Sequence, residues 1–220
     1  MFNERNQPFN TTDSAYVQSQ LKAAGIHGGA YVKPFGVNLT KAFSLFEDSI
    51  NEYLATNMVN LTNGWETNTP QGLYESEYED RAVMGKIGYL EQTIDQALYP
   101  VRGTETMNLT NDQSYIYTFN SKPPVQSFGF WSLTLYDATG TLVENPEDKY
   151  TDYATSDDGI FQILVQPYSN PPPSNWTNNW LPAPAGALFS VMLRLYGPTE
   201  DFQNGKWEYP VIIKGDAFVA

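Results

Sequence analysis

The sequence predicts a mainly β protein with an α-helical N-terminal part: an antiparallel, jelly-roll-like β-sandwich covered by several helices. Up to about residue 100, apolar residues recur with the period of an α-helix. After Val101 they alternate with the period of a strand. We therefore expect a helical region at 1–100 and a β region at 101–220, which together form one compact domain.

Three segments of the first region fit the helical period, and capping or breaking residues bound each of them. They are 12–25, 39–60 and 72–99, and Gly88 is expected to divide the last into two short helices. Asn63-Gly64 is a strong turn signal between the second and third segments.

Strands are predicted in the second region wherever apolar and polar residues alternate between turn signals. Ala138-Thr139-Gly140 and Asp157-Asp158-Gly159 are read as turns, and the second lacks the run of acids that a dedicated calcium loop supplies. The predicted strands are QSYIYTF (113–119), GFWSLTLYD (129–137), TLVEN (141–145), IFQILVQ (160–166), ALFSVMLRLY (187–196) and YPVIIK (209–214).

The strand at 187–196 has two unlike faces, because successive side chains of a strand point to opposite sides. Val191, Leu193 and Leu195 give one face an aliphatic character that is typical of a core. Arg194 falls on the other, mixed face, where a ligand could lie. A mixed face with a fixed cation therefore becomes a candidate site.

Other aromatic residues are assigned structural roles. Trp180 precedes two prolines that fix the backbone, so we expect it to pack on them in a stiff corner that aims the next strand. Phe128, Phe130 and Trp131 are expected to lie in the core of the sandwich.

Composition excludes several classes of function. The formal net charge of -13 disfavours nucleic acids and anionic membranes as partners. The chain has no cysteine, which excludes disulfides, thiolate catalysis and cysteine-bound zinc, and its single histidine excludes a multi-histidine metal site. No apolar run is long enough to span a bilayer. We therefore expect no metal and no cofactor.

The chain is rich in N-x-S/T sequons, which are acceptors for N-glycosylation in secreted proteins. With the Asn-rich, Lys-poor composition they predict a secreted or secretory-pathway glycoprotein whose signal peptide is absent from this chain. The predicted glycosylation sites are Asn10, Asn38, Asn60, Asn108 and Asn175.

Several motifs carry a resemblance to a known family. GFWSLTLYDATGTLVENPEDKYTDY, SDDGIFQILVQ, NWLPAPAGALFSVMLRLYGP and KWEYPVI resemble the domain of unknown function 1214. NGWETNTPQGLYESEYEDRAVMGKIGYLEQTIDQALYP resembles the region that links this domain to its usual N-terminal partner, domain 1254. The resemblance covers roughly residues 63–213, and it implies a β-sandwich. The chain keeps only a short stretch of the first domain.

The resemblance also implies a function. One group of small fungal secretory proteins of this kind resembles hetero-Diels–Alderases, which join a tropolone o-quinone methide to a humulene-type terpene. We therefore expect a cofactor-free pericyclase of natural-product biosynthesis, with assisted dehydration as a further activity. The alternatives are a secreted protein that binds a small apolar molecule or a glycan, and a structural module that forms a homodimer.

Two arginines are candidate catalytic residues. Arg81 lies in a segment rich in tyrosine and acids, where it could polarise a carbonyl or pair with an acid at helical spacing. Arg194 could bind a ligand oxygen or pair with Asp137 or Glu144, since a buried charge must be paired.

Histidine and tyrosine supply the other catalytic candidates. His27 lies in a glycine-rich connector and could act as a general acid or base, or simply lie at the surface. Tyr136, like Tyr150 and Tyr153, flanks the first long hairpin, where a hydroxyl could donate to a developing oxyanion. Tyrosines at the rim of a sandwich are also ordinary.

The expected substrates are hydrophobic organic molecules, so aromatic and flexible apolar side chains are the candidate binding residues. They are Tyr74, Tyr78, Trp65, Trp176, Tyr150, Met192 and Tyr196.

Overall fold

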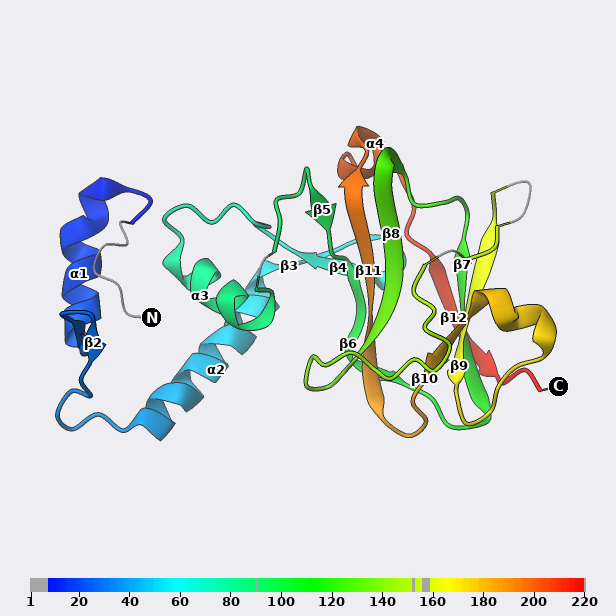
Figure 1. The fold of residues 1–220 in the computed structure, drawn as a ribbon, viewed down its shortest axis with the longest axis horizontal. Coiled ribbons are helices and arrows are strands. Elements are labelled where there is room, and N and C mark those ends of the chain that lie inside the picture. Colours follow the sequence, from blue (N-terminus) through cyan, green and yellow to red (C-terminus); the bar gives the residue numbers. More distant parts are fainter. Residues whose placement is uncertain (1–7, 90, 152, 156–158, 220) are drawn as a thin grey trace. The chain divides into compact units, whose positions relative to one another are not determined.

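The computed structural model describes residues 8–89, 91–151, 153–155 and 159–219, and it divides the chain into two compact units (Figure 1). The helical unit comprises the chain up to Asn57 together with Gly72–Glu91. The β unit comprises Met58–Gln71 and Gln92–Ala220. The division therefore differs from the expected boundary near residue 100, because the chain crosses between the units several times.

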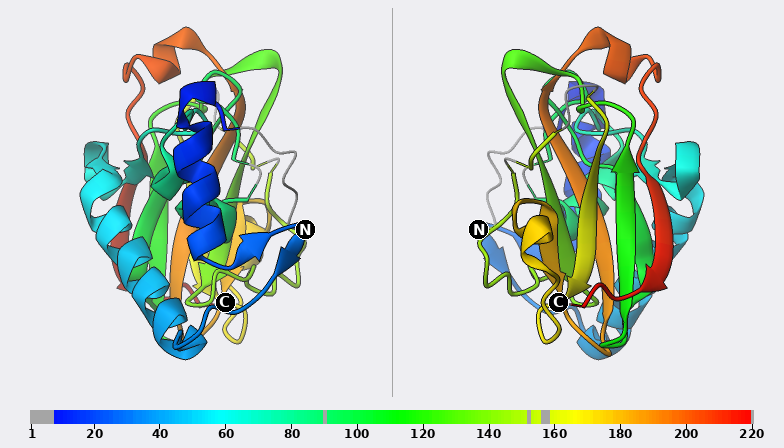
Figure 2. Two further views of the ribbon diagram at one scale, coloured as in Figure 1. Left: turned by 90° about the vertical axis from the view of Figure 1, so that its left-hand side faces the viewer. Right: turned by 90° about the vertical axis from the view of Figure 1, so that its right-hand side faces the viewer.

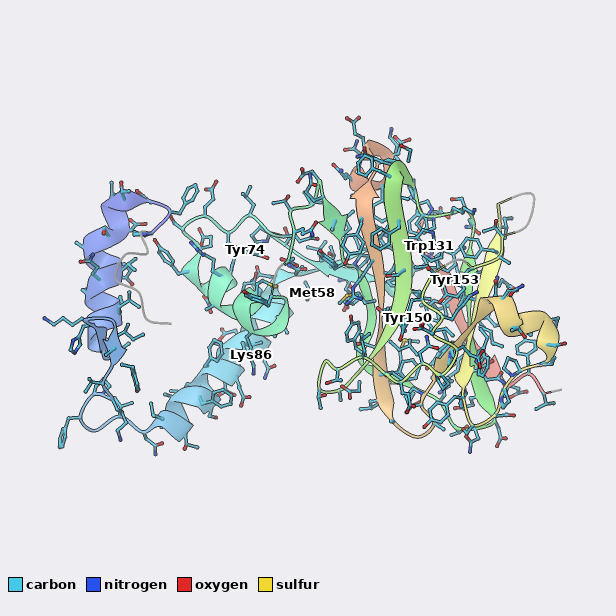
Figure 3. The ribbon with its side chains drawn as sticks, viewed as in Figure 1. Met58, Tyr74, Lys86, Trp131, Tyr150 and Tyr153 are labelled. Atoms are coloured by element: carbon cyan, nitrogen blue, oxygen red, sulfur yellow. The ribbon has the colours of Figure 1, made fainter. Side chains whose placement is uncertain are left out.

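The helical unit is built on three helices. They are α1 (Ser14–Ala23), which a 3-10 turn (Thr11–Asp13) precedes, α2 (Leu39–Asn57) and α3 (Tyr78–Ile87). α2 and α3 bury Ile50, Tyr53, Val83 and Met84 in a small core, against which Tyr74 packs (Figure 3). The described helices include none that is long and apolar enough to cross a membrane.

Two details of this part of the chain differ from what the sequence indicated. The glycine-rich connector contains a hairpin of β1 (Ile26–His27) and β2 (Ala30–Tyr31). The described residues after Gly88 form no second helix. The apolar residues near the end of this segment instead form the short strand β5 (Ala97–Leu98), which is buried and pairs with β11. Tertiary pairing therefore overrides the local helical pattern.

The β unit contains two sheets (Figure 2). The smaller sheet has the order β10-β9-β7-β12, and the right-hand view of Figure 2 looks onto it. In the larger sheet the order is β3-β4-β6-β11, while β5 and β8 also pair with β11. The strands are β3 (Met58–Asn60), β4 (Glu66–Asn68), β6 (Val101–Asn108), β7 (Gln113–Phe119), β8 (Val125–Asp137), β9 (Phe161–Pro167), β10 (Trp180–Ala183), β11 (Leu188–Pro198) and β12 (Val211–Asp216).

The two sheets curl around one shared core, so the β unit is a half-barrel of curved sheets (Figure 2). The prediction of a β-rich fold with N-terminal helices is thus confirmed. The strand order does not reproduce a clear jelly roll, and β10 pairs with β9 in parallel, against the expected all-antiparallel arrangement. The predicted strand at 141–145 is a single bridge between Leu142 and Tyr136.

The alternating faces of β11 are confirmed. Val191, Leu193 and Leu195 are fully buried, whereas Arg194 is half-buried on the opposite face. Trp180 is also buried, as expected of a corner residue, but its indole nitrogen donates to the carbonyl of Gln166 on β9 at 3.1 Å. The corner is therefore held by the parallel strand pair.

β8 corrects the prediction for its aromatic residues. Phe128 and Phe130 are 77% and 54% exposed, so they lie outside the core. Trp131 is half-buried and packs against the core residues Phe119 and Phe161, at centroid distances of 5.6 and 5.8 Å. Of the three aromatic side chains that were predicted to lie in the core, Trp131 alone packs against it.

Hydrogen bonds connect the turn near residue 63 to the C-terminal part of the chain. Trp65 is fully buried, and its indole nitrogen donates to the carbonyl of Pro210 at 3.0 Å. The side-chain amide of Asn63, which takes the left-handed conformation of the predicted turn, donates to the carbonyl of Tyr209 at 2.6 Å. These bonds explain why residues 58–71 belong to the β unit.

Candidate functional site

A pocket of about 470 Å³ opens beside the first half of β8. It combines aromatic walls with one cationic side chain and one buried phenol. It is lined by Lys122, Val125, Gly129, Phe130, Trp131, Thr151 and Tyr153.

Gly129 sets the local geometry of this wall. An added Cβ would lie 2.4 Å from the carbonyl oxygen of Tyr196 on β11, a distance that no real side chain tolerates. The absence of a side chain lets β8 and β11 approach closely. Phe130 and Trp131 follow directly and, as neighbours in a strand, point to opposite faces.

An aromatic stack supports the pocket from the core side. The rings of Trp131 and Tyr153 lie 5.6 Å apart with an angle of 25° between them (Figure 3). Phe119 and Phe161 stack beneath at 4.5 Å. Stacked aromatic residues have few rotamers to lose, so this wall is rigid before any ligand binds.

The hydroxyl of Tyr153 is an unused hydrogen-bond donor. Tyr153 is 6% exposed, and its hydroxyl is buried without a hydrogen-bond partner among the described residues. Burial raises the pKa of this phenol, and the neighbouring Tyr150 acts in the same direction. The hydroxyl is therefore protonated at neutral pH, and it belongs to a residue that lines the pocket.

Lys122 supplies the positive charge of the pocket. Its side chain is exposed at the rim. None of the described residues that line the pocket is acidic. Lys149 lies nearby, with its ammonium nitrogen 5.8 Å from the ring centroid of Tyr153.

The four predicted catalytic residues lie elsewhere. Arg194 pairs with no acid within the described part of the chain, and its guanidinium carbon lies 5.2 Å above the ring of Tyr136. Arg81 is exposed and donates through Nη1 to the carbonyl of Glu75 at 3.2 Å, instead of forming an ion pair. His27 is exposed on β1 of the helical unit. The predicted cluster is therefore divided between the two units.

Three of the predicted binding residues have structural partners. Tyr74 donates its hydroxyl to the carboxylate of Glu91, and Tyr78 donates to Asp13 at 3.4 Å, both within the helical unit. Trp65 was expected to line a site, and its indole is buried in the core of the β unit, where it is hydrogen-bonded.

The other four lie in the β unit at different distances from the pocket. Tyr196 stacks on the pocket residue Phe130 with centroids 4.5 Å apart, so it extends that wall. The carbonyl of Tyr150 accepts from the amide of Leu133, which fixes the segment that carries Tyr153. Met192 lies farther along β11, and Trp176 packs on Phe218 at 5.2 Å.

Sequence reasoning missed Lys122, and it misplaced Phe130 by assigning it to the core. A signal for the aromatic pair was present, since Trp131 shares its parity with the apolar Leu133 and Leu135, which leaves Phe130 on the outer face. No comparable signal marks Lys122, because any exposed loop can carry a lysine.

Further predictions concern metals and modification. Among the residues that the structure describes, no three His, Asp or Glu side chains are grouped so that they could hold a metal ion. The Asp157-Asp158 turn lies outside the described residues. All five sequon asparagines are exposed, and the attachment of glycans to them stays a prediction.

The comparisons with known proteins bear on the part of the chain that holds the pocket. Residues 96–200 match the model of a family described as protein of unknown function (DUF1214). The chain thus carries a DUF1214 domain. Every residue that lines the pocket lies within this domain.

One solved structure extends the likeness along most of the chain. The VPA0106 protein from Vibrio parahaemolyticus is 16% identical, with a TM-score of 0.53 over 94% of this chain and 52% of that chain. An uncharacterized protein from Burkholderia cenocepacia is 13% identical, with a TM-score of 0.37 over 93% of this chain and 50% of that chain. No curated protein matches the chain. The chain therefore shares a fold with the Vibrio protein, and it spans about half the length of both structures.

Proposed function

We propose that this protein binds a small, largely apolar organic molecule in the pocket beside Trp131, and that it promotes a cofactor-free hetero-Diels–Alder cycloaddition there. The observation that carries the proposal is the buried hydroxyl of Tyr153, a residue that lines this pocket, which has no hydrogen-bond partner among the described residues. A buried donor without a partner is costly, so such a group is typical of a site that an outside acceptor completes.

The size and lining of the pocket support binding. Its volume of about 470 Å³ falls in the range of small-molecule sites. Trp131 and Phe130 offer aromatic surface to a ligand. Polar groups also line the pocket, and in small-molecule sites such groups fix the orientation of a ligand.

The same groups suit a cycloaddition. In this reaction the oxygen and the terminal carbon of a heterodiene form bonds to the two carbons of an alkene, and no atom leaves. Tyr153 would donate a hydrogen bond to the heterodiene oxygen, which withdraws electron density and lowers the barrier. The Phe130–Tyr196 stack offers the second reactant an adjoining apolar surface. Holding both reactants together would supply the rest of the acceleration.

The decisive experiment mixes the protein with an o-quinone methide precursor and a humulene-type alkene, and follows the product by chiral chromatography. We expect a faster reaction with one dominant enantiomer. Tyr153→Phe should lower the rate by about 10- to 100-fold, whereas Tyr168→Phe, which removes a half-exposed hydroxyl outside the pocket, should leave it unchanged. A racemic product formed at the rate without protein would refute the catalytic part of the proposal.

We also propose that the protein enters the secretory pathway and carries N-linked glycans. The exposure of Asn10, Asn38, Asn60, Asn108 and Asn175 supports this, because a sequon must be accessible to be modified. Intact mass of the protein from its native source, before and after treatment with a glycosidase, tests it. An unchanged mass that equals the polypeptide alone would refute it.

A further inference from the structure

We infer that the ligand of the Trp131 pocket is a planar aromatic molecule that carries a negatively charged oxygen, which Lys122 and Tyr153 recognise. This inference rests on the proposed binding function, and it adds the charge and shape of the ligand. Three independent features of the pocket carry it.

The first feature is charge. The chain carries 25 acidic and 12 basic residues, so an average surface site faces negative neighbours. Among the described residues that line this pocket, by contrast, Lys122 is charged and none is acidic. Lys149 adds a second ammonium group close by, 5.8 Å above the ring of Tyr153. Two ammonium groups at and beside a pocket whose described lining holds no acid favour an anion over a neutral molecule.

The second feature is hydrogen bonding. The Tyr153 hydroxyl is buried and unpartnered among the described residues, and burial keeps it protonated by raising its pKa. A phenol offers one donor, and its best acceptor is an anionic oxygen, since charge-assisted hydrogen bonds are the stronger ones. One oxyanion could accept from Tyr153 and lie near the ammonium of Lys122.

The third feature is shape. Trp131 and Tyr153 stack within 25° of parallel, and Phe130 forms another wall of the same pocket. Aromatic walls favour a flat aromatic ligand, which can stack on them or meet them edge to face. The pocket volume of about 470 Å³ is enough for two fused rings with a substituent.

The test measures binding of three probes to the full chain by isothermal titration at low salt. The probes share a naphthalene ring: 2-naphthoate is an anion, 2-naphthamide is neutral, and 2-naphthyltrimethylammonium is a cation. We expect 2-naphthoate to bind at least about tenfold more tightly than 2-naphthamide. Its affinity should fall as salt is added. The cation should bind least.

Variants assign the preference to the pocket. Lys122→Met should lower the affinity for 2-naphthoate by about tenfold and leave the affinity for 2-naphthamide unchanged, because only the anion interacts with the charge of Lys122. Tyr153→Phe should weaken both probes, since both carry an acceptor oxygen. Lys214→Met is the matched control: Lys214 is an exposed lysine above a tyrosine ring, at 5.4 Å from Tyr115, outside the pocket.

The outcomes separate this inference from the proposal on which it rests. Equal affinity for 2-naphthoate and 2-naphthamide, unchanged in Lys122→Met, would overturn the anionic ligand while leaving the binding function intact. Tight binding of the cation would overturn it as well. Absence of binding by all three probes would overturn the binding function and the inference together.

Discussion

The phenol ring of Tyr153 and the indole of Trp131 lie 5.6 Å apart in a stack that joins β8 to the segment that follows it. Trp131 also contacts the core rings of Phe119 and Phe161, so one side chain belongs both to the core and to the pocket. Changes at Trp131 should therefore weaken ligand binding and stability together, whereas changes at Tyr153 that keep the ring should weaken binding without destabilising the fold.

Replacing Trp131 should weaken ligand binding. We expect Trp131→Leu to reduce the affinity for 2-naphthoate by at least about tenfold, because a buried aromatic anchor is the main source of binding energy in such a site. Trp176→Leu is the matched control, since Trp176 is also half-buried but packs on Phe218 outside the pocket. Isothermal titration measures both, and circular dichroism verifies the fold. Equal losses in the two variants would contradict the site.

The close approach of β8 to β11 depends on Gly129. We expect Gly129→Ala to lower the free energy of unfolding by about 2 kcal/mol or more, because its Cβ would lie 2.4 Å from the carbonyl oxygen of Tyr196. Gly215→Ala in β12 is the control, since its Cβ meets nothing within 4 Å. Its effect should stay within about 0.5 kcal/mol. Urea unfolding followed by fluorescence measures both, and similar values for the two variants would refute the steric argument.

Gln166 holds the C-terminal segment. It is fully buried, its Nε2 donates to the carbonyls of Asn170 and Phe218 at 2.6 and 2.9 Å, and its Oε1 accepts from the amide of Phe218 at 2.8 Å. Gln166→Met keeps the length but leaves these groups unpaired, which should cost about 2–4 kcal/mol of unfolding free energy. Gln162→Met, at an exposed position bonded to Thr118, should cost less than about 0.5 kcal/mol. Thermal and urea unfolding test the difference, which a loss below 1 kcal/mol at Gln166 would contradict.

Tyr53 should titrate late in the folded protein. Burial and the negative charge of Asp80 raise its pKa to about 12. Between pH 10 and 12 the unfolded chain has lost this proton while the folded chain keeps it, so this group lowers the free energy of unfolding as pH rises through that window. Below pH 10 the effect is absent.

Absorbance at 295 nm tests the titration of Tyr53. The difference between the native protein and Tyr53→Phe should show no tyrosinate signal at pH 10 and should gain it near pH 12. Tyr89→Phe, at an exposed position, controls for the loss of one phenol from the total absorbance. A Tyr53 signal that is complete by pH 10.5 would contradict the raised pKa.

Local patterns predicted the strands that lie across the core. β7 is found at the predicted residues 113–119, and the two faces of β11 follow the alternation that the sequence displays. Alternation is a local property of the chain, so it can be read without knowing the partner strand. The same reasoning places Trp131 with Leu133 and Leu135, and therefore places Phe130 outside.

Local patterns could not predict which strands pair with one another when they are far apart in the sequence. β5 is two residues long, and it is a strand because β11 lies beside it. β10 pairs with β9 in parallel through a crossover connection. The residues of β10 alone give no signal of this pairing. The pocket has the same character, since Lys122, Trp131 and Tyr153 come from three segments that only the folded sheet brings together. Candidate residues that looked reactive in isolation, such as Arg81 and His27, did not share that site.

The bond between the indole of Trp65 and the carbonyl of Pro210 spans 145 residues. During synthesis at about 5–20 residues per second, Pro210 is therefore made about 7–30 seconds after Trp65. Throughout that interval the indole that later fills the core has no site in which to be buried, and the half-barrel cannot close around it. A ribosome stalled before residue 209 should present Trp65 to chaperones, and release of the last strand should be the step that ends this exposure.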